Sequence, residues 1–128
     1  MVAWADYKAE AKGRGALALE FYVAHSTPAK APEDVKANLP DHLAYQADLE
    51  RQGQLAFAGP MSDESGDHMQ GMGLIIYRAD NLEQARALAE ADPMHKSGAR
   101  RFVLRRWMIN EGSLNFSGGL STGDLTFS

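Results

Sequence analysis

One histidine and one aspartate of this sequence could act as a chemical pair, although they lie far apart in the chain. His42 falls within "LPDHLAYQADLE", and Asp92 closes the stretch "LEQARALAEADP". An imidazole whose one nitrogen is held by a carboxylate has a fixed tautomer and becomes a better base. Such a pair could move a proton on a small organic molecule.

Helical spacing predicts that both side chains point inward. At about 100° per residue, His42 shares its face of a helix with the apolar residues Val35 and Leu49. Asp92 lies on the apolar side of a second helix, where Pro93 takes the chain out of helical geometry. A structural reading stays open, because a hydrogen bond that ties two helices together would also satisfy a buried carboxylate.

The elements that must position this pair follow from apolar periodicity and breaker residues. Alternation or apolar runs predict strands, and amphipathic stripes with caps predict helices. Pro40 should kink or split the first helix, and Gly59-Pro60 should form a turn after the second strand. The expected strands are 16–25, 54–61, 72–79 and 100–109, and the expected helices are 32–52 and 81–92. The order predicts an α+β fold, the ferredoxin-like split β-α-β-β-α-β with an antiparallel four-stranded sheet and both helices on one face.

Length and charge narrow the class of protein. A chain of 128 residues suits one domain, 1–128, with a core at about 16–109 and a tail at 110–128. The net charge of −4 argues against a nucleic-acid partner. The absence of cysteine excludes disulfides and thiol nucleophiles. No apolar run is long enough to cross a membrane, so we expect a cytoplasmic protein.

The sheet should carry a second apolar face that two helices cannot cover. Its expected members are Ala18, Tyr22, Ala56, Ala58, Ile75 or Leu74, and Trp107 or Phe102. An identical subunit is the simplest cover, because a two-fold pairing satisfies both chains at once. We therefore expect a homodimer, a dimeric α+β barrel in which two sheets face each other.

The Gly- and Ser-rich tail still carries large apolar residues, which disordered linkers seldom contain. They are Leu114, Phe116, Leu120, Leu125 and Phe127. Docking of the tail on its own subunit or on the partner is one reading, and a frayed terminus is the other.

Several other residues could line a substrate pocket. Tyr22 is expected to face the space between two sheets, Gly59 and Pro60 to present backbone, and His95 to join Asp92. Arg105, on a basic strand, could anchor an anionic substrate, although edge protection by charge also explains that strand.

Two further histidines are weaker candidates. His25 ends a strand, where a role in a turn is the simpler reading. His68 lies near Asp63, Glu64 and Asp67, but this spacing fits neither a calcium loop nor a zinc helix motif. We expect a solvated loop there and no metal site.

Three short pieces of the sequence resemble the YCII-related family of small dimeric α+β-barrel proteins. They are His42-Leu43, Gly59-Pro60 and Ala91-Asp92-Pro93, within a similarity that covers roughly residues 16–109. The resemblance implies that His42 and Asp92 form a His-Asp dyad in a pocket at the junction of sheet and helices. Characterised relatives include a dehydrochlorinase-type lyase, so the resemblance also favours catalysis.

We therefore expect a small enzyme that needs no cofactor, in which Asp92 orients His42 and His42 acts as general base on a small molecule. The reaction would be an elimination, a hydrolysis or an isomerisation. A ligand-binding or regulatory homodimer without turnover is the alternative. A haem-binding barrel of the same fold would need an exposed axial histidine.

Overall fold

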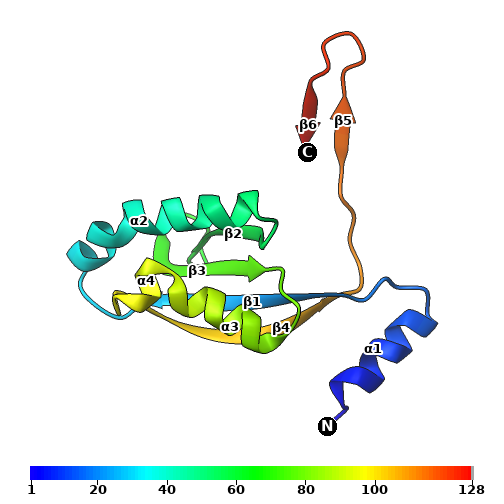
Figure 1. Cartoon of the computed structure of the whole chain (residues 1–128), viewed down its shortest axis with the longest axis horizontal. Coiled ribbons are helices and arrows are strands. Elements are labelled where there is room, and N and C mark those ends of the chain that lie inside the picture. The colour runs from blue at the N-terminus through cyan, green and yellow to red at the C-terminus, as the bar shows by residue number, and fades with distance from the viewer. Residues whose placement is uncertain (128) are drawn as a thin grey trace. The chain divides into compact units, whose positions relative to one another are not determined.

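The computed structural model of the chain describes residues 1–127. Its contacts divide the chain into two units, one of residues 20–108 and one of residues 1–19 together with residues 109 onward. In chain order (Figure 1) the elements are α1 (Trp4–Gly13), β1 (Leu19–Pro28), α2 (Pro32–Arg51), β2 (Leu55–Ser62), β3 (Met69–Tyr77), α3 (Leu82–Ala91), α4 (Pro93–Lys96), β4 (Arg100–Ile109), β5 (Phe116–Gly118) and β6 (Leu125–Phe127).

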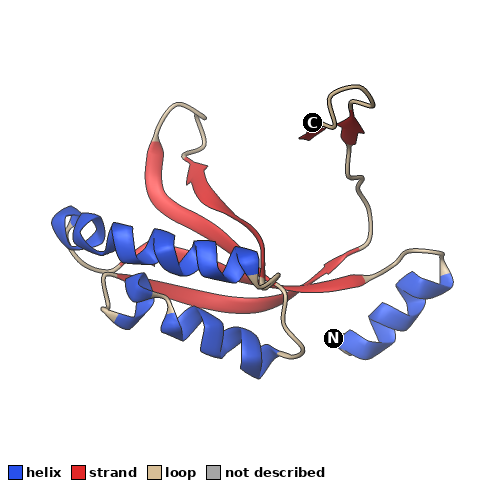
Figure 2. Cartoon of the chain, turned by 45° about the horizontal axis from the view of Figure 1, so that its top comes forward, coloured by secondary structure: helices blue, strands red, loops and turns tan. Residues whose placement is uncertain are grey.

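Four strands of the larger unit form one sheet in the order β2-β3-β1-β4. Strand β3 pairs antiparallel with both β1 and β2. Helices α2 and α3 pack on one side of this sheet (Figure 2). The predicted α+β, ferredoxin-like arrangement is therefore confirmed, and β4 has the predicted bounds of 100–109.

Strand β1 begins and ends three residues later than predicted. Ala18 has a φ of 49°, which is outside the extended region, so the strand begins at Leu19. The strand then continues through Ser26 to Pro28, a segment that the sequence had suggested was a turn.

The core between sheet and helices is built around residues that face α2 and α3. Tyr22 and Ala24 of β1 pack there with Leu49 of α2 and Ala85 of α3. The predicted position of Tyr22 on the helix-free face is thus wrong. Apolar residues occupy both faces of β1, so alternation alone did not reveal which face the helices cover.

Pairing of the strands shows which residues form the helix-free face. Tyr22 lies opposite Tyr77, and Ala24 opposite Ile75, so both pairs point toward the helices. Ala58 also pairs with Ile75, so Ala58 lies on the helix side and not where it was expected. Of the alternatives Ile75 and Leu74, it is Leu74, opposite His25, that lies on the helix-free side. Alternation then places on the helix-free face Phe21, Val23, Phe57, Ile76, Val103 and Trp107. We call this set the open face.

Helix α2 begins with proline and contains another. Pro32 occupies the first turn, where its missing amide has no cost, and Gly53, with a φ of 77°, follows the end of the helix. Pro40 lies inside, yet residues 32–51 remain one helix, so the predicted split does not occur.

Helix α3 has the predicted N-cap. The Asn81 side chain accepts a hydrogen bond from the amide of Gln84 at 2.8 Å. Pro93 ends α3 as predicted, but it also begins α4, a short helix that the sequence did not indicate. Asp92 caps α4, and Pro93 suits a first helical position because its absent amide is not needed there.

The Gly59-Pro60 pair lies within β2, which corrects the predicted turn. Gly59 pairs with Leu74, and Pro60 pairs with Gly73. An edge strand tolerates proline because one side of its backbone has no partner strand. β3 begins at Met69, earlier than predicted, after a loop in which Asp63 accepts hydrogen bonds from Ser65 and Gly66.

The smaller unit contains elements that the sequence analysis did not predict. Helix α1 is followed by Gly15, whose φ of 95° needs glycine. In the tail, β5 pairs antiparallel with β6, so that Phe116 lies opposite Phe127. Among residues 1–127, no helix combines the length and the apolar character needed to span a membrane.

Candidate active site

His42 and Asp92 meet between α2 and the start of α4. Nδ1 of His42 lies 2.8 Å from Oδ1 and 2.9 Å from Oδ2 of Asp92. A carboxylate only accepts hydrogen bonds, so Nδ1 carries the proton and Nε2 remains for a ligand. The contact predicted from helical spacing is therefore present.

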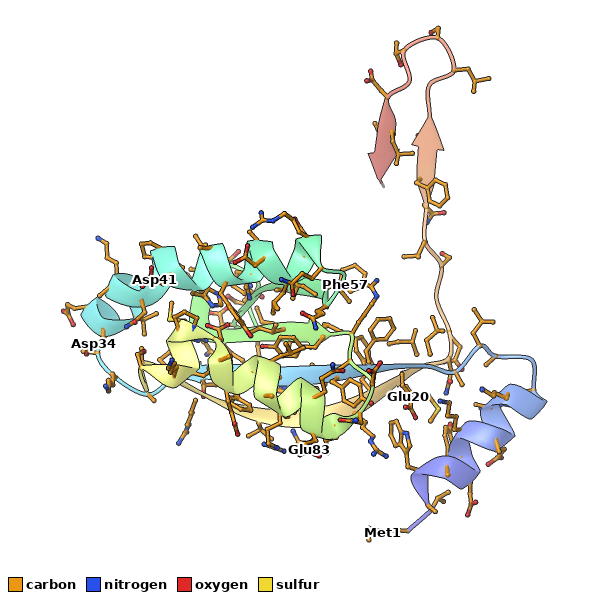
Figure 3. The ribbon with its side chains drawn as sticks, viewed as in Figure 1. Met1, Glu20, Asp34, Asp41, Phe57 and Glu83 are labelled. Atoms are coloured by element: carbon orange, nitrogen blue, oxygen red, sulfur yellow. The ribbon has the colours of Figure 1, made fainter. Side chains whose placement is uncertain are left out.

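The two side chains differ in exposure. That of Asp92 is 1% exposed and that of His42 is 15% exposed. The neighbouring residue in the sequence is also a carboxylate, Asp41, which is exposed on α2 (Figure 3). The carboxylate that holds the imidazole therefore comes from another element, at the end of α3.

Backbone geometry holds Asp92 toward His42. Oδ1 of Asp92 also accepts a hydrogen bond from the amide of Met94 at 2.9 Å, as the N-cap of α4. The hydroxyl of Tyr45 donates to the carbonyl of Leu88 at 2.7 Å, which ties α2 to α3. Both helices that carry the pair are thus fixed relative to each other.

A cavity of about 470 Å³ lies beside His42. This volume is in the range of small-molecule sites. Its walls come from α2, β2, β3 and the region of Met94, and most of the side chains are apolar. The polar side chains that line it are Ser26, His42, Gln46 and Arg100.

A second group of polar residues lies at the Ser26 side of the cavity. Ser26 Oγ lies 2.9 Å from Nε2 of His95, and Nδ1 of His95 lies 2.7 Å from the carbonyl oxygen of Ala89. Arg100 donates from Nε to Ser26 Oγ at 2.9 Å and from Nη2 to the Ser26 carbonyl at 2.7 Å. Nη2 also donates to the carbonyl of Gly71.

The residues predicted to line a pocket divide into two sets. Gly59 and Pro60 line the cavity. His95 is half-buried in α4, behind Ser26, and does not itself line the cavity. Tyr22 lies in the core, and Arg105 lies on the same side of β4 as Val103, away from the helices. The arginine of β4 that lines the cavity is Arg100, and not Arg105.

The weaker histidine candidates lie elsewhere. His25 belongs to β1, pairs with Leu74 and points to the side opposite Ala24. His68 is highly exposed, with Nδ1 at 3.7 Å from Oδ2 of Asp63. In the part of the chain that the structure describes, no cluster of three or more histidine, aspartate or glutamate side chains could hold a metal ion.

Of the polar side chains that line the cavity, three were not predicted as pocket residues: Ser26, Gln46 and Arg100. Ser26 shares its face of β1 with Tyr22 and Ala24, so a polar residue in this apolar row was a usable signal. The signal was lost because the strand was predicted to end at His25. Arg100 was grouped with other basic residues of β4, although it is the one that lines the cavity.

The fold and the cavity define a class of small α+β proteins with a carboxylate-held imidazole beside an apolar site. The YCII-related domain model matches residues 20–108, so the chain belongs to this family. This segment is also the larger of the two units.

Two known proteins are similar to the chain. One is the uncharacterized protein YjpA of Bacillus subtilis (strain 168), 29% identical over 70 residues, which are 55% of this chain and 75% of YjpA. The other is a solved structure, 5-chloro-2-hydroxyhydroquinone dehydrochlorinase (TftG) from Burkholderia phenoliruptrix AC1100 in complex with 2,5-dihydroxybenzoquinone. It is 18% identical, with a TM-score of 0.49, and the match covers 68% of this chain and 92% of TftG.

Proposed function

We propose that this protein is an enzyme in which His42 acts as general base on a small organic molecule bound in the cavity, while Asp92 orients it. The observation that carries the proposal is the hydrogen bond from Nδ1 of His42 to the buried Asp92 carboxylate, beside a cavity that His42 lines. A base needs a fixed tautomer and access to its substrate, and this arrangement supplies both.

The proton transfer follows from the tautomer. Nε2 of His42 takes a proton from an acidic C–H or O–H of the substrate, and the Nδ1–H of the resulting imidazolium still donates to the Asp92 carboxylate. The carboxylate stabilises this cation and holds the ring in place. Asp92 is thus a positioning residue, whereas His42 touches the reacting atoms.

The cavity limits the substrate. Its volume of about 470 Å³ suits a small molecule, and its mainly apolar wall favours a mostly apolar one. General acid–base catalysis contributes about 10²- to 10⁴-fold, enough for a molecule that is already activated. We propose eliminations, hydrolyses or isomerisations of such molecules, without a cofactor.

We also propose that the protein is a homodimer joined through the open face. Phe57, Val103 and Trp107 lie on this face with exposed fractions of 61%, 53% and 45%. The cover of α2 and α3 lies on the other side of the sheet. A second copy related by a two-fold axis would bury both identical faces.

The chromogenic probe 5-nitrobenzisoxazole tests the proposed base. Loss of its C–H proton to a base breaks the N–O bond and releases a coloured nitrophenolate, so turnover requires nothing beyond a placed base. Wild-type protein should accelerate this elimination above the buffer rate, and His42→Ala should lower kcat/KM by about 10²-fold or more.

A matched control separates catalysis from general damage. His68→Ala removes an exposed imidazole outside the cavity and should leave the rate unchanged. Circular dichroism and the melting temperature must show that His42→Ala is folded. Equal rates in wild type and folded His42→Ala would reject the base and favour a ligand-binding protein without turnover.

A further inference from the structure

The hydrogen bonds of His95 define where its protons are. The Ala89 carbonyl only accepts, so Nδ1 of His95 donates to it over 2.7 Å. In the neutral ring, Nε2 is then an acceptor, and the hydroxyl of Ser26 donates to it over 2.9 Å. A serine hydroxyl that points its proton at the free nitrogen of an imidazole is an arrangement suited to proton transfer.

The neutral form of His95 is the favoured one. Burial lowers the pKa of His95, and electrostatic interaction with His42 and Arg100 lowers it too. The hydrogen bond to the Ala89 carbonyl and the negative charge of Asp92 act in the other direction and raise this pKa. The imidazole is therefore neutral, with Nε2 as its acceptor, and a negative charge placed nearby would stabilise its protonated form.

Ser26 connects this imidazole to the cavity. Ser26 and Arg100 line the cavity, whereas His95 lies behind Ser26 and bonds to its hydroxyl. Nε of Arg100 donates to the same oxygen over 2.9 Å, which leaves one lone pair of Ser26 Oγ for a ligand. The guanidinium also brings a positive charge to this end of the cavity.

We infer that Ser26 and His95 form a second proton-transfer pair of the cavity, in which the Ser26 hydroxyl carries a proton between a ligand oxygen and Nε2 of His95. This inference rests on the proposed function, since it requires that the cavity binds a small molecule. The inference implies a ligand that carries an ionisable oxygen, such as a phenol or an enol, in addition to the atom from which His42 takes a proton.

The step balances without a further reactant. The ligand O–H gives its proton to Ser26 Oγ while the original hydroxyl proton moves to Nε2 of His95. The ligand oxygen becomes an anion next to Arg100, and His95 becomes an imidazolium whose Nδ1–H still donates to the Ala89 carbonyl. Reversal of both transfers returns a proton to the ligand, so the pair can act as acid or base.

The test uses para-nitrophenol, whose absorbance reports its ionisation, in the His42→Gln variant, where the first base is absent. Absorbance follows the bound phenol, and ¹H–¹⁵N spectra of the histidine side chains follow protonation of His95. Binding should ionise the phenol and place protons on both nitrogens of His95. Adding Ser26→Ala should raise the apparent pKa of the bound phenol by about one unit and leave His95 neutral.

Two controls address folding and specificity. Ser26→Thr keeps the hydroxyl and should keep the response, and Thr27→Val removes the next hydroxyl, which contacts Arg101 and not His95. The inference would be overturned by any of three results: His95 stays neutral while the phenol is bound, phenol ionisation and His95 protonation are the same in Ser26→Ala, or the phenol does not bind. The base activity of His42 is judged separately on 5-nitrobenzisoxazole, so either can fail alone.

Discussion

Two imidazoles lie around one buried carboxylate in this protein, and they differ in how they are held. His42 donates directly to Asp92, whereas His95 donates to a backbone carbonyl and senses Asp92 only through its charge. One ring is thereby prepared to form a cation beside a carboxylate, and the other is kept neutral by burial. The difference assigns separate parts to the two rings in the proposed chemistry.

Burial of His95 predicts acid sensitivity of the fold. Its pKa is lowered from 6.5, so below about pH 6.5 the unfolded chain binds a proton that the folded chain does not. The free energy of unfolding should therefore fall as the pH falls through this range, and be unaffected by this group at higher pH. Urea denaturation at about pH 7.5 and pH 5.5 measures the difference, which should be smaller in His95→Gln.

The control for this pH effect is His68→Gln, which removes an exposed imidazole. It should keep the wild-type dependence on pH. An unchanged dependence in His95→Gln would show that burial of this ring has no part in acid sensitivity.

At the scale of single residues, the sequence predicted the pair of His42 and Asp92 because each lies on the inward-facing apolar stripe of a helix. It did not predict Ser26 or the buried position of His95. Both depend on α4, whose four residues are too few to show periodicity, and on where β1 ends. Arg100 could not be told from its basic neighbours, because only the pairing of strands decides which arginine meets the cavity.

At the scale of elements, the site depends on how α3 ends and α4 begins. Asp92 is the last position of one helix and the cap of the next, so its carboxylate is fixed at a bend in the chain. The N-terminal end of α3 was predictable from Asn81 and Gln84, whereas α4 was not. The four-stranded antiparallel sheet with both helices on one face followed from the β-α-β-β-α-β pattern, but which residues of β1 face the helices did not, since both faces of that strand are apolar.

The Asn81 cap predicts a measurable contribution to stability. Asn81→Ala removes the acceptor for the Gln84 amide and should lower the free energy of unfolding by about 1 kcal/mol in urea denaturation. Asn81→Asp keeps an acceptor and should lose little. Equal losses in the two variants would mean that the side-chain oxygen is not what stabilises this helix end.

At the scale of the whole molecule, the open face is an apolar surface that a partner subunit could bury. The sequence predicted an apolar second face, and the structure has one; Leu74 of β3 lies on it as one of the predicted alternatives, whereas Phe21 and Val23 of β1 replace Tyr22. A second apolar face was predicted correctly even though some of its residues were not, because apolar residues line both sides of the central strands.

A charge on the open face should separate the proposed dimer. Phe57→Arg should raise the dimer dissociation constant by about 100-fold or more in analytical ultracentrifugation, because an unpaired buried charge costs roughly 3 kcal/mol or more. Glu83 is exposed on α3 (Figure 3), on the helix side of the sheet, so Glu83→Lys changes a charge there and should leave the dimer dissociation constant unchanged. A wild-type protein that sediments as a monomer would reject the dimer.

In the proposed chemistry Asp92 acts through His42, and a double-mutant cycle on 5-nitrobenzisoxazole turnover measures this dependence. His42→Ala and Asp92→Asn should each lower kcat/KM, while the double variant should match His42→Ala within about threefold, because a positioning residue has no effect once the base is gone. Asp41→Asn controls for loss of a carboxylate and should have no effect. Losses that multiply in the double variant would contradict the account.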